Sequence, residues 1–269
     1  MDDLIFELNE VKFSYLDKFP ALCGIDIDIK KGEKIAVIGA NGSGKSTFLQ
    51  ILDALSFPNK GSVKFLGREL KEGSFDDPEF SDYFRKTVGM VFQNPDVQLF
   101  CPTVGEDIVF GPLQLGISRP EIKKRFEELT SLLNIKDLLD RQPHSLSIGE
   151  KRKVAIASTL MINPDVLLLD EPTAGLDPLT TRHIIDFLLQ ANAEGKTIIT
   201  STHDLHIVEE ISDMVYVFSQ EKRIAGSGTP EDILHNFRLL QDNNLVHIHK
   251  HRHDGKVHIH PHQHLDHHH

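Results

Sequence analysis

The segment GANGSGKS, residues 39–46, constrains the fold of this chain more than any other stretch. The apolar run KIAVI precedes it and helix-forming residues follow from about Lys45, which predicts a strand, a tight turn and a helix. The spacing fits G-x-x-x-x-G-K-[ST], in which glycines let successive backbone N–H groups surround a phosphate chain at the positive end of the helix. The expected phosphate-binding residues are Gly39, Asn41, Gly42, Ser43, Gly44, Lys45, Ser46 and Thr47, with Lys45 reaching the β- and γ-phosphates.

A second motif, DVLLLDEP at residues 165–172, adds carboxylates to this phosphate site. Its apolar residues predict a buried strand that ends at Asp170, whose carboxylate can hold Mg²⁺ together with the Ser46 hydroxyl. Glu171 then lies where it can orient or deprotonate a water for attack on the γ-phosphate. Two acids at a strand end are often only solvated, but their position after a phosphate loop favours ATP hydrolysis with ATP and Mg²⁺ as cofactors.

The order of the elements predicts an α/β fold. The expected strands LIFELNEVKFSY, TVGMVFQ, DVLLLD, KTIITST and MVYVFS alternate with helical stretches, which is typical of a parallel sheet covered on both faces. Helical patterning predicts an inserted subdomain at about residues 95–160. The segment KEGSFDDPEFSDYFRK is polar and interrupted, and we expect it to be a surface excursion, whereas TPEDILHNF should be a last short helix. Residues 1–244 are therefore expected to form one domain, followed by a tail at residues 245–269.

Composition narrows the class of partner. The formal charge of −11 argues against a nucleic-acid-binding surface, which is basic. Cys23 and Cys101 are far apart and form no metal-binding or disulfide pattern, so a reducing cytosol is the expected setting. No run approaches the 18 or so apolar residues of a membrane span, and the N-terminus is acidic where a signal peptide is basic. If the chain works at a membrane, we expect it to do so through a partner.

The segment LSIGEKRKVAIA, residues 146–157, resembles the signature sequence of ATP-binding cassette (ABC) ATPases, and the resemblance extends over residues 4–240. It implies a P-loop core with an antiparallel β subdomain and an inserted helical subdomain. It also implies that Ser147 and Gly149, at the start of a helix, bind the nucleotide of a partner protomer, so that ATP is held between two subunits. The family usually has a second glycine at the position of Ile148, which leaves the fine geometry of this contact open.

The same resemblance assigns further residues. Asp177, in AGLD, belongs to the loop between subunits, and His203, in STHD, is the histidine that contacts the γ-phosphate. Gln93 senses Mg²⁺ and the transmembrane partner. Tyr15 stacks on adenine, although Phe13 is a rival and a tyrosine packed within its strand is the alternative. The expected catalytic residues are Gln93, Glu171 and His203, and the expected Mg²⁺ ligands are Ser46, Gln93 and Asp170.

The segment FQNPDVQLFCPTVGEDIVFGP, residues 92–112, resembles the ATPases of energy-coupling-factor importers, which take up vitamins or cobalt and nickel ions. In that class this region contacts a transmembrane coupling subunit, to which Asp96, Glu106 and Asp107 would offer negative charge; the alternative is a solvated helix start. Cys101 is expected to pack rather than to react.

The importer resemblance defines the expected function and its alternatives. The principal hypothesis is a peripheral ATPase at the cytoplasmic face of the membrane that energises import of a transition-metal ion, cobalt or nickel. The alternatives are a shared ATPase of a vitamin importer and a soluble ABC ATPase that transports nothing. Expected partners are a second ATPase, identical or related, a coupling subunit and a substrate-binding membrane subunit.

The tail holds eleven of the sixteen histidines. Histidines alternate with other residues on both sides of Asp254 and Gly255, and DG between alternating runs predicts a β-hairpin. A turn centred there pairs His247 with His262, His249 with His260, and His251 with His258. Imidazole binds Ni²⁺, Co²⁺, Cu²⁺ and Zn²⁺, so these six residues form a hypothetical metal site in a segment that we expect to be disordered without metal. The alternative is a histidine-biased tail without an ordered site, in which only His267–His269 resembles an artificial tag.

Overall fold

The computed structural model describes residues 3–253 and 256–263, with side chains for residues 3–246. Its first layer is an antiparallel sheet of order β2-β1-β4-β5. The strands are β1 (Leu4–Tyr15), β2 (Phe19–Lys30), β4 (Lys60–Phe65) and β5 (Arg68–Glu69). This sheet is the antiparallel β subdomain that the family resemblance implies.

The central layer is a six-stranded sheet of order β10-β9-β3-β8-β7-β6, in which every neighbouring pair except β9 and β10 is parallel. It is built from β3 (Lys34–Gly39), β6 (Val88–Val91), β7 (Val166–Asp170), β8 (Thr197–Thr202), β9 (Met214–Phe218) and β10 (Ile224–Gly228). The strands expected from the sequence at β6, β7, β8 and β9 are all present. Their parallel arrangement confirms the predicted α/β fold.

Both faces of the central sheet are covered by other elements. Successive residues of a strand point to opposite faces, so they pack into different apolar clusters. Val166 and Leu168 pack into a cluster with the antiparallel sheet and α1 (Lys45–Leu52), whereas Leu167 and Leu169 pack into a second cluster. That second cluster contains residues of α5 (Ile148–Leu160) and α6 (Pro178–Ala193). The carboxyl end of β3, at Gly39, leads through residues 40–44 into the start of α1 at Lys45.

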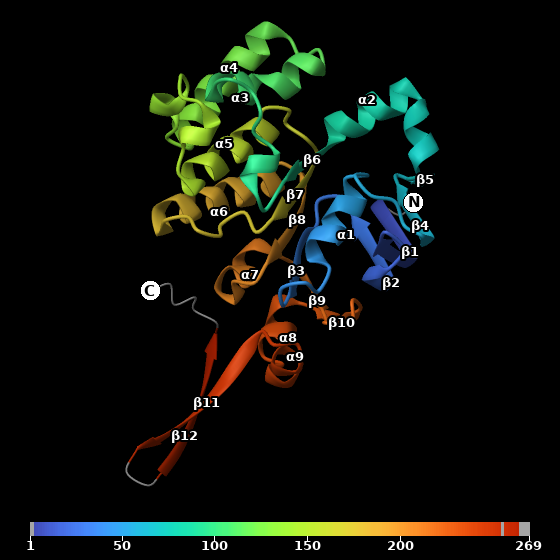
Figure 1. The fold of residues 1–269 in the computed structure, drawn as a ribbon, viewed down its shortest axis with the longest axis vertical. Helices are drawn as coiled ribbons and strands as arrows, with labels where there is room; N and C mark the ends of the chain where they lie inside the picture. Colours follow the sequence, from blue (N-terminus) through green and yellow to red (C-terminus); the bar gives the residue numbers. More distant parts are fainter. Residues whose placement is uncertain (1–2, 254–255, 264–269) are drawn as a thin grey trace.

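Between β6 and β7 the described chain is helical. Its principal helices are α3 (Val104–Gln114), α4 (Arg119–Leu132) and α5, which gather at one end of the molecule (Figure 1). The short 3-10 turns η2 (Pro95–Val97), η3 (Lys136–Leu138) and η4 (Pro143–Ser145) connect them. The surface excursion expected at residues 71–86 is mostly exposed, but its helical structure was not predicted. That segment forms the 3-10 turn η1 (Glu72–Asp76) and helix α2 (Pro78–Thr87), which Asp77 caps and which buries Phe80 and Phe84.

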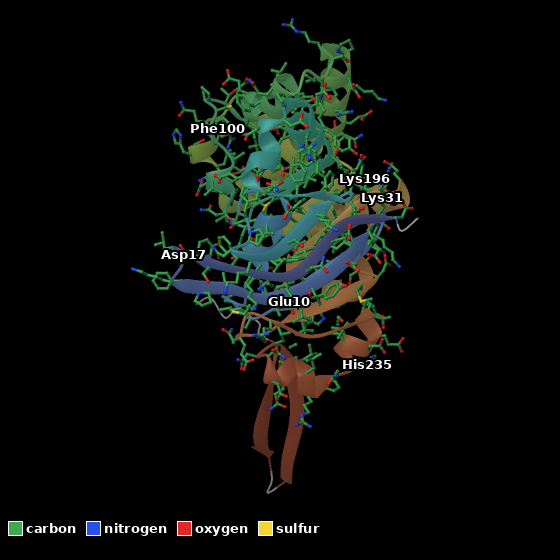
Figure 2. All side chains as sticks on the ribbon, turned by 90° about the vertical axis from the view of Figure 1, so that its right-hand side faces the viewer. Glu10, Asp17, Lys31, Phe100, Lys196 and His235 are labelled. Carbon is green, nitrogen blue, oxygen red and sulfur yellow. The ribbon has the colours of Figure 1, made fainter. Side chains whose placement is uncertain are left out.

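The C-terminal part has α7 (Leu205–Ile211), α8 (Pro230–Leu234) and α9 (Phe237–Asp242), then a hairpin of β11 (Val246–His253) and β12 (Lys256–Gln263). The hairpin projects from the end of the body opposite the helical part that carries Phe100 (Figure 2). Its register pairs His247 with His262, His249 with His260, and His251 with His258, as the sequence predicts. The expected turn at Asp254 and Gly255, together with His264 and His267–His269, lies outside the described residues. Disorder of the metal-free tail stays a prediction. No helix among the described residues is long and apolar enough to cross a bilayer.

Candidate active site

The phosphate loop and helix α1 form one wall of a cavity of about 410 Å³. Gly44 has φ +107°, and a Cβ there would lie 2.4 Å from the carbonyl oxygen of Ala21, so only glycine fits this point of the turn. The hydroxyl of Ser43 is fully buried and has no hydrogen-bond partner among the described residues. A loop with a buried, unsatisfied hydroxyl at a helix N-terminus fits an anionic ligand. The cavity is lined by Tyr15, Phe19, Pro20, Ala21, Asn41, Gly42, Ser43, Gly44, Lys45, Ser46, Thr47, Gln93, Asp170, Glu171 and Lys222.

Lys45 lies inside this cavity beside two carboxylates. Its ammonium donates to the carbonyl oxygen of Gly39 over 2.7 Å. Burial lowers the pKa of Lys45, and the charges of Glu171 and Asp170 oppose that shift. A buried cation in contact with a loop of backbone N–H groups is suited to a phosphate chain, whose negative charge would replace its carbonyl partner.

Glu171 occupies a restrained position at the end of β7. Its backbone has φ +50°, an uncommon conformation for a residue with a side chain, and its N–H is held by both the carbonyl and the hydroxyl oxygen of Ser201. The Glu171 carboxylate is buried, and its Oε2 lies 2.8 Å from Nδ1 of His203. The strand end and the next strand thus fix the carboxylate, and His203 orients it from the solvent side.

Mg²⁺ fits the oxygen atoms that the cavity provides. The side chains of Ser46, Gln93 and Asp170 line the same cavity and offer a hydroxyl, an amide and a carboxylate oxygen, which are the ligand types that Mg²⁺ prefers. Ser201 donates to Oδ1 of Asp170 over 2.5 Å, which orients the buried carboxylate. These three residues are therefore the candidates for holding the ion next to a nucleotide.

Tyr15 rather than Phe13 lines the cavity. The Tyr15 side chain is 42% exposed, and its hydroxyl lies 3.0 Å from Thr47 Oγ1 and donates to Gln50 over 3.1 Å. Phe13 packs against the core beneath it, edge to face with Tyr15. Phe19, which is 63% exposed, lines the same mouth of the cavity and was missed from the sequence. The two exposed rings, Tyr15 and Phe19, are the candidates for a stacking contact with a base.

The signature segment is not part of this cavity. Ser147 caps α5: its hydroxyl accepts from the N–H of Glu150 and donates to the Glu150 carboxylate over 2.8 Å. Gly149 and Asp177 likewise do not line the cavity. The carboxylate of Asp177 accepts hydrogen bonds from Thr180, which lower its pKa. A Cβ at Gly149 would lie 3.6 Å from the Leu176 side chain, so the signature and the AGLD loop meet at one place on the surface. The chain thus carries two separate candidate nucleotide surfaces.

Two basic residues of the site were missed from the sequence. Arg152 is buried in α5, and its guanidinium donates to the carbonyl oxygens of Gln93, Glu171 and Ala174, with 2.6 Å to Gln93 and 3.0 Å to Glu171. Lys222, in the β9–β10 turn, donates to the carbonyl oxygen of Gly42 and lines the cavity. Neither residue belongs to a recognised phosphate motif. The sequence does not indicate which distant backbone carbonyls the side chains of Arg152 and Lys222 will reach.

The expected acidic docking surface needs correction. Asp107 is buried, and its Oδ1 accepts from the N–H groups of Phe100 and Cys101, both over 3.0 Å, so it offers no charge to a partner. Asp96 and Glu106 are exposed, but Asp96 pairs with Lys151 and Glu106 completes a capping box with Thr103. Burial, with a hydrogen bond to Asp107, raises the pKa of the Cys101 thiol to about 11, which agrees with packing rather than reactivity.

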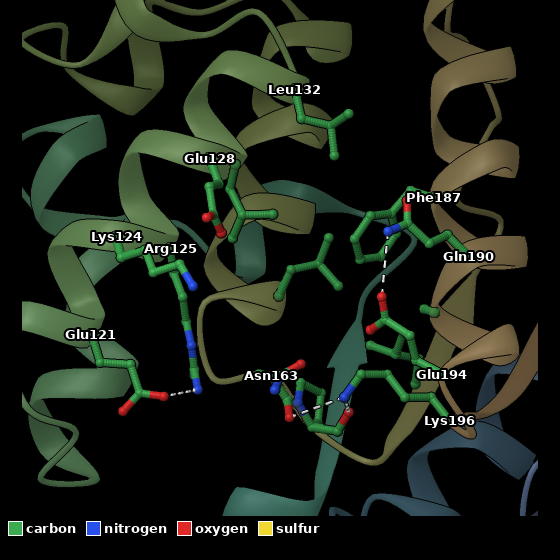
Figure 3. Close-up of a pocket in the computed structure, with 15 residues that line it drawn as sticks. Glu121, Lys124, Arg125, Glu128, Leu132, Asn163, Phe187, Gln190, Glu194 and Lys196 are labelled. Carbon is green, nitrogen blue, oxygen red and sulfur yellow. Dashed lines mark hydrogen bonds and ion pairs between the residues drawn. The ribbon is translucent and has the colours of Figure 1, made fainter.

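A larger cavity, about 660 Å³, lies between α4 and α6 and contains none of the expected site residues (Figure 3). Its lining includes the apolar side chain of Phe187, and two of its three cations donate to backbone carbonyl groups. Arg125 donates to the carbonyls of Met161 and Ile162, and Lys196 to those of Asn163 and Pro164. The polar side chains of this cavity therefore connect the helical part to the central sheet, and we assign no catalytic role to them.

Comparison with known proteins is consistent with this geometry. The sequence profile of the ABC transporter family matches residues 22–174. The chain is 44% identical over 244 residues to the nickel import ATP-binding protein NikO of Rhodobacter capsulatus, covering 90% of this chain and 95% of NikO. It is 42% identical over 241 residues to the energy-coupling factor transporter ATP-binding protein EcfA of Methanococcus maripaludis, covering 90% and 85% of the two chains. The structure of CbiO1 from Clostridium perfringens, part of the CbiONQ ABC transporter complex, aligns with a TM-score of 0.72 and 36% identity, covering 91% of this chain and 96% of CbiO1.

Proposed function

Because the chain belongs to the ABC transporter family, as an ATP-hydrolysing subunit, we propose that it energises import of a transition-metal ion, cobalt or nickel, through an energy-coupling-factor transporter. It acts at the cytoplasmic face of the membrane as a peripheral subunit. A coupling subunit in the membrane transmits its movements, and a second membrane subunit binds the ion. The soluble, non-transporting alternative is set aside, because the relatives named above are transporter subunits.

The chemistry follows from the cavity. Lys45 and the N–H groups of the phosphate loop bind the β- and γ-phosphates. Ser46, Gln93 and Asp170 would hold Mg²⁺, which would supply positive charge next to these phosphates. Glu171 accepts a proton from the water that attacks the γ-phosphorus, and the bond to the β–γ bridging oxygen breaks to release ADP and phosphate. His203 keeps the Glu171 carboxylate in position through Nδ1 and contacts the γ-phosphate from the exposed side of the site.

Hydrolysis requires a second ATPase subunit. Ser147 and Gly149 do not line the cavity of their own chain, so they serve the nucleotide of a partner, as the family resemblance implies. Ile148 and Leu179 are 63% and 65% exposed beside the signature and AGLD segments, where a partner would cover them. The partner is a second copy or a related ATPase; both arrangements bring a signature segment to each phosphate loop.

The observation that carries metal rather than vitamin transport is the hairpin register, which opposes histidine to histidine at three consecutive positions on one face. NikO is named for nickel import, which supports the same cargo. The name of EcfA specifies an energy-coupling factor transporter but no metal. A shared ATPase that serves vitamin-binding subunits is therefore the second candidate function.

The coupling subunit has an apolar surface to dock on. Val97, Phe100, Phe110 and Leu113 are exposed by 64%, 66%, 41% and 50%, and the rings of Phe100 and Phe110 lie edge to face with centroids 4.9 Å apart. Exposed apolar side chains in contact with each other are typical of protein interfaces. This patch replaces the acidic surface as the proposed contact with the membrane complex.

Co-expression with the membrane subunits tests the transporter assignment. The wild-type chain should move to the membrane fraction only when those subunits are present, and Phe100→Asp should reduce its retention there. Tyr83→Asp is the matched control, because Tyr83 is a comparably exposed aromatic residue on α2, outside this patch. A chain that stays away from membranes in the presence of its subunits would refute the assignment.

A further inference from the structure

The hairpin of β11 and β12 segregates its histidines. Directly opposed residues of an antiparallel pair share a face, and successive residues alternate between faces. The three histidine pairs and His253, which is opposite Lys256, therefore occupy one face. The other face of the described hairpin has no histidine and consists of Val246, Ile248, Lys250, Arg252, Val257, Ile259, Pro261 and Gln263.

This arrangement supplies the ligands of a transition-metal site. Opposed residues of an antiparallel pair lie roughly 5 Å apart, and positions two residues along a strand are about 7 Å apart, so two adjacent pairs place four histidine positions next to one another on this face. Imidazole suits Ni²⁺, Co²⁺, Cu²⁺ and Zn²⁺. Elsewhere, among residues whose side chains the structure describes, no group of three or more histidine, cysteine or acidic side chains could hold a metal. Apart from the proposed Mg²⁺ ligands of the nucleotide cavity, the histidine pairs of the hairpin are therefore the candidate ligands of a transition-metal site.

The root of the hairpin is joined to the catalytic end of the molecule. Val246, the first residue of β11, and Leu245 before it are buried in one apolar cluster with Leu205 and Val208 of α7. The N–H of Leu245 is fixed by the carbonyl oxygen of Leu240 in α9 over 2.9 Å. Helix α7 begins at Leu205, two residues after His203, which holds the Glu171 carboxylate. A restraint on the hairpin root therefore acts on helix α7, which begins two residues after His203 of the active site.

We propose that the histidine face of the hairpin is a regulatory site for the imported ion class, and that Ni²⁺ or Co²⁺ bound there lowers the rate of ATP hydrolysis through α7 and His203. An isolated two-stranded hairpin has marginal stability in water, so the ion changes its order, and the packed root transmits that change. The identity of the ion rests on the proposed function, whereas the existence of the site rests on the hairpin register alone. The device would reduce import when the ion is already abundant inside the cell.

The test uses the full-length chain and a permuted chain of identical composition. The permutation is His249→Lys, Lys250→His, Ile259→His and His260→Ile, which moves the middle histidine pair to the other face. Titration with Ni²⁺ and with Co²⁺ against a competing chromophoric chelator measures affinity, and phosphate release at a fixed excess of Mg²⁺ measures hydrolysis. We expect the wild-type chain to bind about tenfold more tightly than the permuted chain, and its ATPase rate to fall about fivefold at saturation while that of the permuted chain changes little.

Equal affinity of the two chains would overturn the site, because histidine content rather than register would then explain binding. An equal response of the two ATPase rates, or none, would overturn the regulation. Neither measurement involves transport. If the assembled wild-type transporter takes up neither Ni²⁺ nor Co²⁺, the proposed function is refuted. The results of the two hairpin measurements would not be affected.

Discussion

Nδ1 of His203 lies 2.8 Å from Oε2 of Glu171, and this contact joins the ends of β7 and β8 at the proposed catalytic carboxylate. The Glu171 side chain is 5% exposed, whereas that of His203 is 46% exposed. The carboxylate therefore has a fixed backbone on one side and, on the other, a side chain that can change partner when a nucleotide enters. This arrangement is compatible with both proposed roles of His203, which are to hold the Glu171 carboxylate and to contact the γ-phosphate.

Replacement of His203 by alanine should lower kcat for ATP hydrolysis about 100-fold, because the Glu171 carboxylate loses the group that orients it. ATP affinity should fall by a much smaller factor, because only the proposed γ-phosphate contact is lost and the phosphate loop is untouched. His206→Ala is the control, because His206 is also exposed and lies one turn away on α7. Steady-state kinetics together with nucleotide-binding titrations measure both quantities, and equal losses in the two variants would argue against the role of His203.

Arg152→Gln should reduce kcat roughly 10- to 100-fold with a smaller effect on ATP affinity. The guanidinium holds the backbone at Gln93, Glu171 and Ala174, and without it these three loops lose their common anchor. Arg152→Lys should recover part of the rate because an ammonium can reach some of the same carbonyls. Lys151→Gln is the neighbouring control, since Lys151 pairs with Asp96 instead. A uniform loss of folded protein in the Arg152 variants, with normal kcat for the folded fraction, would indicate a purely structural role.

Gly44→Ala should destabilise the fold by about 1–3 kcal/mol and abolish ATP binding. Its positive φ and the carbonyl oxygen of Ala21, 2.4 Å from the added Cβ, both oppose the substitution. Gly42→Ala also has positive φ, but the added Cβ would meet nothing within 4 Å, so its loss of stability should be smaller. Thermal unfolding measures the loss of stability of each variant relative to the wild type. Equal destabilisation of the two variants would contradict the importance of the Ala21 contact.

Asp53 should make stability depend on pH. Burial raises its pKa from 3.8 to about 7, with the charge of Arg85 opposing the shift. Between these values the folded chain retains a proton that the unfolded chain has lost, so this contribution to stability falls as pH rises from about 4 to about 7 and is constant above. Asp53→Asn should therefore gain melting temperature relative to the wild type across that range. A difference between the two proteins that does not vary with pH would show that Asp53 titrates normally in the folded chain.

Much of the fold could be predicted because its signals are local. The apolar run before Asp170 and the glycines before Lys45 identify the two halves of the site without any knowledge of packing. Helix α2 was missed because its polar residues conceal Phe80 and Phe84, which reach the core only after the antiparallel sheet is assembled.

The limits of prediction appear where function depends on distant contacts. Asp107 looks like any acid in the first turn of a helix, and only the fold shows that its carboxylate turns inward to the backbone of Phe100 and Cys101. Arg152 and Lys222 likewise reach carbonyls far away in sequence. In contrast, the hairpin register could be predicted, because DG between two strictly alternating runs of sequence predicts every opposed pair.

The most direct test of the account measures uptake of labelled Co²⁺ and Ni²⁺ by cells that express the complete transporter with wild-type chain or with Glu171→Gln. The variant should still bind ATP, since the phosphate loop is intact, but should release no phosphate and support no uptake. The account predicts ion uptake with the wild type only. Uptake that survives in Glu171→Gln, or a wild-type complex that imports a vitamin but neither ion, would contradict it.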